Sequence, residues 1–319
     1  MSYNCVVLLG PTAVGKTAVG VRLAQKLNGE IISADSRQVY RGLDIGSGKD
    51  LDEYEIDGQK IPYHLIDVCD LSTEFSLFDF QELFYKSFDS IRLRAHLPIV
   101  VGGTGMYLDS ILRKYDMPPL PDSAQIKEWR EELSQKSYDE LKSILIAEKK
   151  KLHNTSEFGS SERILKAILL NRFRATDECK KIVCEYEKRP VVKPLVLGTT
   201  LERSRVREKI KNRLCQRLDA GLIEEVENLH KNGASWERLE SLGLEYRFVS
   251  QFLKGEIESK EKLTELLGIA IGQFAKRQET WFRGMEKKGV KVHWLPKNES
   301  VDERLFAALE LCRENVFCD

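Results

Sequence analysis

The 319-residue chain has no net charge, no long apolar run and no cluster of metal-ligating side chains. Fifty Lys and Arg balance fifty Asp and Glu, which removes any bulk-charge argument for a nucleic-acid or membrane partner. The longest apolar runs, residues 5–9 and 99–101, are far below the roughly 20 residues of a membrane helix, and no signal-peptide pattern opens the chain. We therefore expect a cytoplasmic protein with no membrane partner.

Cysteine and histidine are few and scattered. The seven cysteines are odd in number, no two have CxxC spacing, and the five histidines lie far apart in the sequence. We therefore expect neither a disulfide scaffold nor a zinc site, and interpret the thiols as reduced and structural. With 42% hydrophobic and 31% charged residues, the composition is that of a globular protein, either one large domain or a core with an appended module.

Short apolar runs alternate with helical periods along much of the chain. Buried strands are predicted at residues 5–9, 30–35, 97–102 and 194–199, and helices at 18–27 and 79–95. This alternation predicts a parallel sheet with helices on both faces. Beyond residue 200 the pattern predicts helices over 203–232 and 262–285, and a last strand at 290–295.

Strand signals stop between the proline-rich residues 118–121 and Pro190, where helical periods such as 123–135 and 162–173 take over. This change predicts a helical insertion. We expect an α/β fold with a P-loop NTPase-like parallel sheet flanked by helices. Its predicted parts are a core at 1–117, a helical insertion domain at 118–190, and a return to the core with a helical C-terminal part at 191–319.

A glycine-rich loop stands between the first predicted strand and the first predicted helix. It matches GxxxxGK[ST] at each fixed position with Gly10, Pro11, Thr12, Ala13, Val14, Gly15, Lys16 and Thr17. In such a loop the backbone N–H groups bind phosphate oxygens, the lysine adds a point charge, and the hydroxyl of Thr17 can ligate Mg²⁺. The motif predicts a site for a di- or triphosphate.

The usual companion of this loop, an apolar strand that ends in aspartate, is not obvious. Residues 99–101 run into Gly102, and only the short segment 64–67 could substitute. An Asn-Lys-x-Asp motif for guanine is also missing from the sequence. Hydrolysis of a nucleotide is therefore not the expected reaction.

Two other predicted strands end in polar residues. Asp35 follows the second strand at the sheet edge where open α/β folds bind ligands, so it could be a general base or simply the N-cap of a helix. Thr104 follows the third strand within Gly102-Gly-Thr-Gly-Met-Tyr107, where the glycines allow close approach of a ligand or form a plain turn. The local residues leave both alternatives open.

The motifs, taken in order, resemble the tRNA dimethylallyltransferase family. They are the loop at 10–17, DSRQVYR at 35–41, DIG at 44–46, HLID at 64–67, GGTGMY at 102–107, GLIEEV at 221–226 and AKRQETWFR at 275–283. This similarity runs over nearly the whole chain, and the last block is specific to that family among P-loop proteins.

The resemblance implies transfer of a dimethylallyl group from dimethylallyl diphosphate to N6 of the adenosine next to the anticodon, with release of diphosphate. It implies Mg²⁺ as cofactor and a tRNA anticodon stem-loop as partner, and we expect a monomer. By resemblance, Asp35 removes the N6 proton, Thr104 orients the adenine, and Arg203 binds the diphosphate. The P-loop then holds a leaving group, so no hydrolytic water has to be positioned.

The target base must be flipped out of its stack to react. By resemblance, the flipped nucleotide contacts Asp35, Ser36, Arg37 and Gln38, and further tRNA contacts come from Arg130, Arg163, Lys166, Lys276, Arg277, Gln278, Trp281 and Arg283. Residues 160–217 carry sixteen Lys and Arg against seven Asp and Glu, which is either an RNA footprint or a set of solvated helix faces. For Trp281 we favour a core position over a stacking surface.

The chain departs from the family pattern at several positions on the expected RNA side. Ile271-Gly272 stands where the family has Thr-Arg, Glu245-Tyr246-Arg247 aligns with Gly-Tyr-Lys, and Lys166 stands where the family has Arg. These departures motivate a diverged RNA-binding paralogue without transferase activity as one alternative. A P-loop small-molecule kinase that binds ATP and a prenyltransferase acting on free adenine nucleotide are the other two.

Overall fold

The computed structural model describes residues 3–116, 118–148, 158–298 and 300–315. The chain forms two compact units. One comprises Met1–Tyr115 together with Pro190–Asp319, and the other comprises Asp116–Arg189, whereas the insertion predicted from sequence spans 118–190. Each unit is described by itself below.

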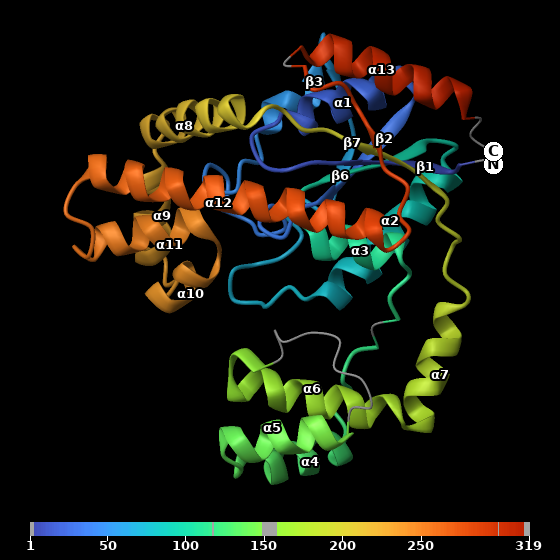
Figure 1. Cartoon of the computed structure of the whole chain (residues 1–319), viewed down its shortest axis with the longest axis vertical. Helices are drawn as coiled ribbons and strands as arrows, with labels where there is room; N and C mark the ends of the chain where they lie inside the picture. Colours follow the sequence, from blue (N-terminus) through green and yellow to red (C-terminus); the bar gives the residue numbers. More distant parts are fainter. Residues whose placement is uncertain (1–2, 117, 149–157, 299, 316–319) are drawn as a thin grey trace. The chain divides into compact units, whose positions relative to one another are not determined.

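A six-stranded parallel sheet forms the centre of the first unit (Figure 1). Its order is β5-β2-β6-β1-β7-β8, with β1 at Cys5–Leu9, β2 at Gly29–Ala34, β5 at Tyr63–His64, β6 at Leu97–Gly102, β7 at Pro194–Gly198 and β8 at His293–Trp294. Leu9 lies opposite both Gly102 and Gly198, and Ala34 also lies opposite Gly102. The carboxyl ends of four strands therefore meet at one edge, and the predicted α/β fold is confirmed.

Helices cover both faces of this sheet (Figure 1). On one face lie α1 at Lys16–Lys26 and α13 at Val301–Glu314, which bury sheet residues Val6, Leu8 and Ile99. On the other face lie α2 at Leu77–Leu93, α3 at Gly105–Leu112 and the last turns of α12, Lys260–Lys287. The continuous apolar strands are explained by this double cover, because both faces of each strand are buried.

A helical cluster extends the first unit beyond the sheet. It comprises α8 at Arg203–Asp219, α9 at Leu222–Lys231, α10 at Trp236–Ser241, α11 at Leu244–Leu253 and the first turns of α12. The single helical stretch predicted over 203–232 is wrong at its middle, because Gly221 has φ of 100° and separates α8 from α9. Leu222 and Val226 can then turn into the same core as Leu214.

The segment between β2 and α2 carries little regular structure. It contains a short 3₁₀ helix, η1, at Leu51–Tyr54, and a small antiparallel hairpin of β3 at Glu55–Ile56 and β4 at Gln59–Lys60. The last predicted strand, 290–295, is shorter than expected and forms only β8, and α13 was not predicted. Among the described residues, no helix is both long and apolar enough to cross a membrane.

The second unit consists of four helices, α4 at Ala124–Ser134, α5 at Tyr138–Glu148, α6 at Ser161–Arg174 and α7 at Asp177–Tyr186. The side chains of Ser123, Ser160 and Thr176 cap the N-termini of α4, α6 and α7. Leu133, Leu145 and Ile168 are fully buried where α4, α5 and α6 meet. The unit therefore has its own small apolar core.

Candidate active site

The P-loop joins β1 to α1 and leaves the start of that helix open. Gly15 occupies the N-cap position with a left-handed backbone, and neither a side-chain cap nor an acidic residue is present in the first turn. The first N–H groups of α1 are therefore available to an anion, which the helix dipole also favours.

Lys16 lies beside the loop that follows β6. Its Nζ donates a hydrogen bond to the Pro11 carbonyl at 3.3 Å, and a Cβ on Gly103 would lie 3.5 Å from this Nζ. Burial lowers the pKa of Lys16 to about 8, although the nearby Asp35 carboxylate acts in the opposite direction. In the described part of the chain no carboxylate forms an ion pair with Lys16, so its charge is available to a ligand.

Asp35 follows β2 and faces the same edge. Its Oδ1 accepts a hydrogen bond from the Arg37 backbone N–H at 2.9 Å, and residues 36–39 form turns rather than an α-helix. The helix N-cap interpretation is therefore wrong, and the carboxylate closes an Asx turn instead. Within the described residues its other oxygen has no hydrogen-bond partner.

Thr104 ties the loop after β6 to the turn after β2. Its Oγ1 accepts a hydrogen bond from the Ser36 backbone N–H at 3.0 Å, and its own N–H donates to the Ala34 carbonyl at 3.2 Å. Asp35 and Thr104 therefore belong to two turns that are directly bonded to each other. The arrangement brings two of the three predicted catalytic side chains, Asp35 and Thr104, to one place.

Gln278 of α12 joins the P-loop to the same glycine turn. Its Oε1 accepts from the Thr12 N–H at 2.9 Å, its Nε2 donates to the Gly103 carbonyl at 2.8 Å, and the side chain is buried. Its predicted tRNA contact stays a prediction. The structure shows that both ends of its amide hold the two loops together, a function that sequence reasoning missed.

On α8, the arginine that is hydrogen-bonded to the P-loop is Arg213, whereas the predicted diphosphate contact of Arg203 stays a prediction. Arg203 begins α8 and is exposed in a groove of about 1260 Å³ between α8 and α12 that reaches Pro11. Arg213 donates a hydrogen bond from Nη2 to the Thr12 hydroxyl. Its pKa is lowered to about 10, first by burial and then by the neighbouring Arg217. Arg213 therefore supplies a second charge beside the loop.

The sequence contained a signal for these two arginines. Ile210, Leu214 and Leu218 form the buried stripe of α8, and Arg213 and Arg217 stand within that stripe rather than on the solvent side. A charged residue at a core position of an amphipathic helix needs a partner. Periodicity alone did not reveal that the partner of Arg213 is the P-loop.

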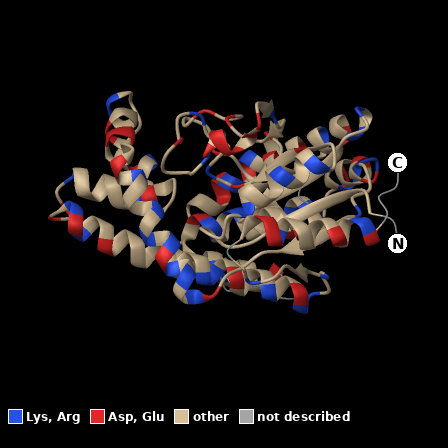
Figure 2. Ribbon diagram, turned by 90° about the horizontal axis from the view of Figure 1, so that it is seen from above, with Lys and Arg blue, Asp and Glu red and all other residues tan. Residues whose placement is uncertain are grey.

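The basic excess of residues 160–217 comes mainly from α8. This helix carries seven Lys and Arg against two Asp and Glu, whereas the unit at 116–189 carries fifteen against fourteen. Figure 2 shows acidic and basic residues interspersed along the ribbon. The insertion is therefore not a basic module, and any RNA contact there depends on particular side chains.

The predicted RNA-binding residues of the insertion are exposed. Arg130 lies on α4, and Arg163 and Lys166 lie one turn apart on α6. Among the described residues these three cations form no ion pair, whereas Arg172 binds Glu132 at 3.1 Å and Glu148 at 2.9 Å. The exposed cations of α6 are thus free to meet phosphates.

Apart from the buried Gln278, the predicted RNA-binding residues of α12 lie on its surface. Lys276 and Arg277 are exposed, and Arg283 is bonded to Glu286 at 3.0 Å. Trp281 is 40% exposed, and a Cβ on Gly105 would lie 2.5 Å from its ring. The core interpretation of Trp281 is therefore wrong, because the side chain is exposed although it touches the start of α3.

The residues that depart from the family pattern have a partner or free space in the structure. Glu245 lies 3.9 Å from Arg217, so a half-buried acid meets a buried base. Burial raises the pKa of Glu245, and Arg217 opposes that shift. Ile271 is packed in the helical core, and Gly272 borders the groove, where a Cβ would have no neighbour within 4 Å.

Comparison with known proteins identifies the family. The family model described as IPP transferase matches residues 38–285, and that described as Isopentenyl transferase matches residues 3–64. The chain belongs to the IPP transferase family. The resemblance inferred from the motifs is thereby confirmed.

Members of the IPP transferase family resemble the chain over almost its full length. It is 48% identical to tRNA dimethylallyltransferase 2 of Treponema denticola, over 92% of this chain and 96% of that protein. It is 49% identical to tRNA dimethylallyltransferase 2 of Syntrophotalea carbinolica, over 92% and 95%. The solved tRNA isopentenylpyrophosphate transferase of Bacillus halodurans is 28% identical, with a TM-score of 0.68 and 98% of both chains covered.

Proposed function

We propose that this chain transfers a dimethylallyl group from dimethylallyl diphosphate to N6 of the adenosine next to the anticodon in tRNA. The observation that carries the proposal is the pairing of two half-sites at one sheet edge. An open P-loop with Lys16 and Arg213 lies beside the bonded turns of Asp35 and Thr104. The family's curated relatives named above are tRNA dimethylallyltransferases, which supports this activity.

The reaction uses the two half-sites in different ways. The N6 nitrogen of adenine forms a bond to C1 of the dimethylallyl group while the bond from C1 to the diphosphate oxygen breaks. Asp35 takes the proton that N6 loses, which makes a weakly nucleophilic amine reactive. The P-loop N–H groups, Lys16 and Arg213 stabilise the charge that grows on the departing diphosphate.

Mg²⁺ fits this arrangement as a partner of the diphosphate. The Thr17 hydroxyl lies in the first turn of α1 and has no hydrogen-bond partner in the described part of the chain. Among the described residues no group of three His, Cys, Asp or Glu could hold a metal by itself. Mg²⁺ commonly binds through few protein ligands plus phosphate oxygens and water, so Thr17 would hold it and it would neutralise charge on the diphosphate.

Hydrolysis of a nucleotide is the less favourable use of this P-loop. The strand beside the loop, β6, ends at Gly102 and is followed by Gly103 rather than by a carboxylate. Asp67, in the one segment that could substitute, is bonded to the ammonium of Lys49. One oxygen of the Asp67 carboxylate is thus engaged by Lys49 and β6 supplies no acid, which agrees with diphosphate as a leaving group.

The acceptor is proposed to be an RNA rather than a free nucleotide. Trp281 and Phe274 are each 40% exposed on α12, and the Arg277 guanidinium lies 6.0 Å from the Phe274 ring centre. Exposed aromatic rings beside arginines are typical of surfaces on which single-stranded bases stack. The exposed cations of α6 add candidate phosphate contacts.

The test is incubation of the protein with labelled dimethylallyl diphosphate, Mg²⁺ and unmodified total tRNA, followed by mass analysis of the nucleosides. The expected product is N6-dimethylallyl adenosine from tRNA, with no product from free adenosine monophosphate. If product forms only from the free nucleotide, the acceptor is a small molecule and not an RNA. Binding of tRNA without any transfer would instead support the diverged paralogue.

A further inference from the structure

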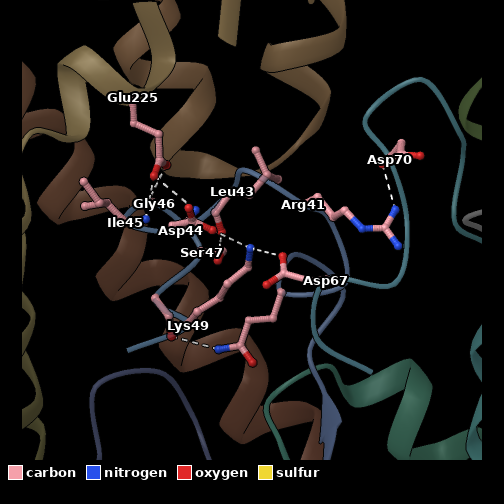
Figure 3. Close-up of polar contacts among 12 residues, drawn as sticks. Arg41, Leu43, Asp44, Ile45, Gly46, Ser47, Lys49, Asp67, Asp70 and Glu225 are labelled. Carbon is pink, nitrogen blue, oxygen red and sulfur yellow. Dashed lines mark hydrogen bonds and ion pairs between the residues drawn. The ribbon is translucent and has the colours of Figure 1, made fainter. Parts of the chain in front are cut away.

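The loop between Arg41 and Lys49 is held by one carboxylate from a distant helix (Figure 3). Oε2 of Glu225, on α9, accepts hydrogen bonds from the backbone N–H groups of Asp44 at 3.1 Å and Ile45 at 2.7 Å. Its Oε1 accepts from the N–H of Gly46 at 3.1 Å and from the Tyr246 hydroxyl at 2.8 Å. Both oxygens of Glu225 are therefore fully used.

The end of the same loop is fixed by a buried lysine. Lys49 is 1% exposed, and its Nζ donates to Asp44 Oδ1 at 2.6 Å and to Asp67 Oδ1 (Figure 3). A buried ammonium that lost these acids would be costly, so Lys49 keeps the loop closed on itself and on the segment after β5.

The loop is bonded in turn to the turn that carries Asp35. Gln38 donates from Nε2 to the Gly48 carbonyl at 2.8 Å, and its Oε1 accepts from the Ser33 hydroxyl at 2.8 Å. The Gln38 carbonyl also accepts from the Asp67 N–H at 3.0 Å. Gln38 is thus a link between the loop held by Glu225 and the last residues of β2.

We propose that Glu225 is a positioning residue for the adenosine acceptor. It holds the backbone of 44–46, this loop holds Gln38, and Gln38 holds the turn in which Asp35 faces the acceptor. This inference rests on the proposed transferase function, since it says that a residue of α9 positions the part of that site that binds the acceptor. None of the hydrogen bonds that lead from Glu225 through the loop to Gln38 and Asp35 is made by a P-loop residue, so we expect binding of the diphosphate substrate to change less than binding of the acceptor.

The physical reason for a carboxylate at this place is the direction of the donors. Three consecutive N–H groups point to one spot, and the loop has no helix or strand in which they could be satisfied. An anion that accepts all three gives short, charge-assisted bonds and selects one conformation of the loop. A neutral side chain can satisfy only some of them.

The test compares Glu225→Ala and Glu225→Gln with the wild type, using the full chain. Glu225→Ala is expected to lower single-turnover transfer by up to about 100-fold, because misplacement of a catalytic group by about 1 Å can cost that factor. It is also expected to raise the KM and the Kd for tRNA several-fold, because the turn at 35–38, which by our proposal contacts the acceptor nucleotide, loses its support. The Kd for dimethylallyl diphosphate, measured without tRNA, is expected to stay within about twofold. Glu225→Gln keeps one acceptor oxygen and is expected to fall between the two.

Glu224→Gln is the matched control, because Glu224 is the exposed neighbour on the same helix. Tyr246→Phe removes one of the four hydrogen bonds to Glu225. It is the milder variant to measure if Glu225→Ala does not fold. Unchanged tRNA constants in Glu225→Ala would overturn the inference, and so would equal losses for both substrates. A wild type that binds tRNA but transfers nothing would contradict the proposed function alone, since the tRNA Kd values still test the role of Glu225.

Discussion

The charge on Lys16 is the residue-scale feature that responds most directly to pH. Burial lowers its pKa to about 8, so in the free protein the ammonium loses its proton as pH rises through that value. We expect the affinity for dimethylallyl diphosphate to be full below about pH 7 and to decrease between pH 7 and 9. Calorimetric titration across this range would measure the change.

Lys16→Arg is the matched variant, because a guanidinium stays protonated across this pH range. It is expected to flatten the dependence even if its absolute affinity is lower. Lys16→Ala should lose affinity at every pH while tRNA binding is retained. If the affinity of Lys16→Arg for dimethylallyl diphosphate still falls near pH 8, a group other than Lys16 is responsible for the pH dependence.

Asp35 gives the sharpest separation of a catalyst from a binding protein. Asp35→Asn keeps the oxygen that accepts from the Arg37 N–H at 2.9 Å, so the Asx turn should persist. It removes the base, and general-base catalysis is typically worth roughly 10² to 10⁴-fold. Single-turnover transfer is expected to fall by about that factor with both substrates still bound, and transfer near the wild-type rate would refute the role of Asp35.

At the scale of single residues, the sequence predicted which residues lie at the site better than it predicted the contacts that they make. Lys16 and Thr17 were predicted from the GxxxxGK[ST] motif. Asp35 and Thr104 were predicted because they follow apolar strands, and the strand ends of a parallel sheet share one edge. Arg213 was missed because seven basic residues share α8 and nothing local tells which one reaches Thr12. The family resemblance pointed to Arg203, whose contact with the diphosphate stays a prediction.

At the scale of elements, the loop at 41–50 could not be predicted from its own residues. Its contacts with Glu225 join positions about 180 residues apart, as between Ile45 and Glu225. The motifs DIG and GLIEEV were recognised separately, but a pattern within one segment carries no information about its partner. The regular strands and helices were predictable because their apolar periods are local, as in α12.

Gly48 tests how tightly α8 packs on this loop. Its φ is 64°, and a Cβ there would lie 1.7 Å from Nη2 of Arg217, which is buried and bound to Asp50 at 3.6 Å. Gly48→Ala is expected to be destabilised by strain and by displacement of a buried guanidinium. Backbone strain at such a φ alone costs of order 1 to 3 kcal/mol.

Gly58→Ala separates these two causes. Gly58 has φ of 76°, but a Cβ there would have no neighbour within 4 Å. Urea unfolding of both variants should therefore show a smaller loss for Gly58→Ala, and the difference reports the contact with Arg217. Equal losses at the two positions would mean that Arg217 moves aside without cost.

At the scale of the whole molecule, the chain places its charges in specific buried clusters although their sum is zero. Glu30 is 2% exposed at the start of β2, at the opposite end of the strand from Asp35. Its carboxylate accepts from Arg94 at 2.7 and 3.0 Å and lies 2.7 Å from both His64 and His96. One side chain thus joins β2, β5, the end of α2 and the residue before β6.

This cluster predicts how the stability of the protein depends on pH. Burial alone would raise the pKa of Glu30, but the hydrogen bonds from Arg94, His64 and His96 outweigh it and lower the pKa from 4.5 to about 2. A lowered pKa means that the stabilisation is present above pH 4.5 and is lost as the pH falls from 4.5 towards 2. The shift corresponds to about 3 kcal/mol at neutral pH.

Glu30→Gln tests this contribution, because glutamine keeps the shape of the side chain but cannot be ionised. The difference in unfolding free energy between wild type and variant is expected to be largest near pH 7, where Arg94 faces a neutral amide in the variant, and to shrink below pH 4.5. Urea unfolding at several pH values would measure it, with the exposed Glu55→Gln as control. A difference that stays constant from pH 7 to pH 3 would show that packing, and not the charge of Glu30, holds these four segments together.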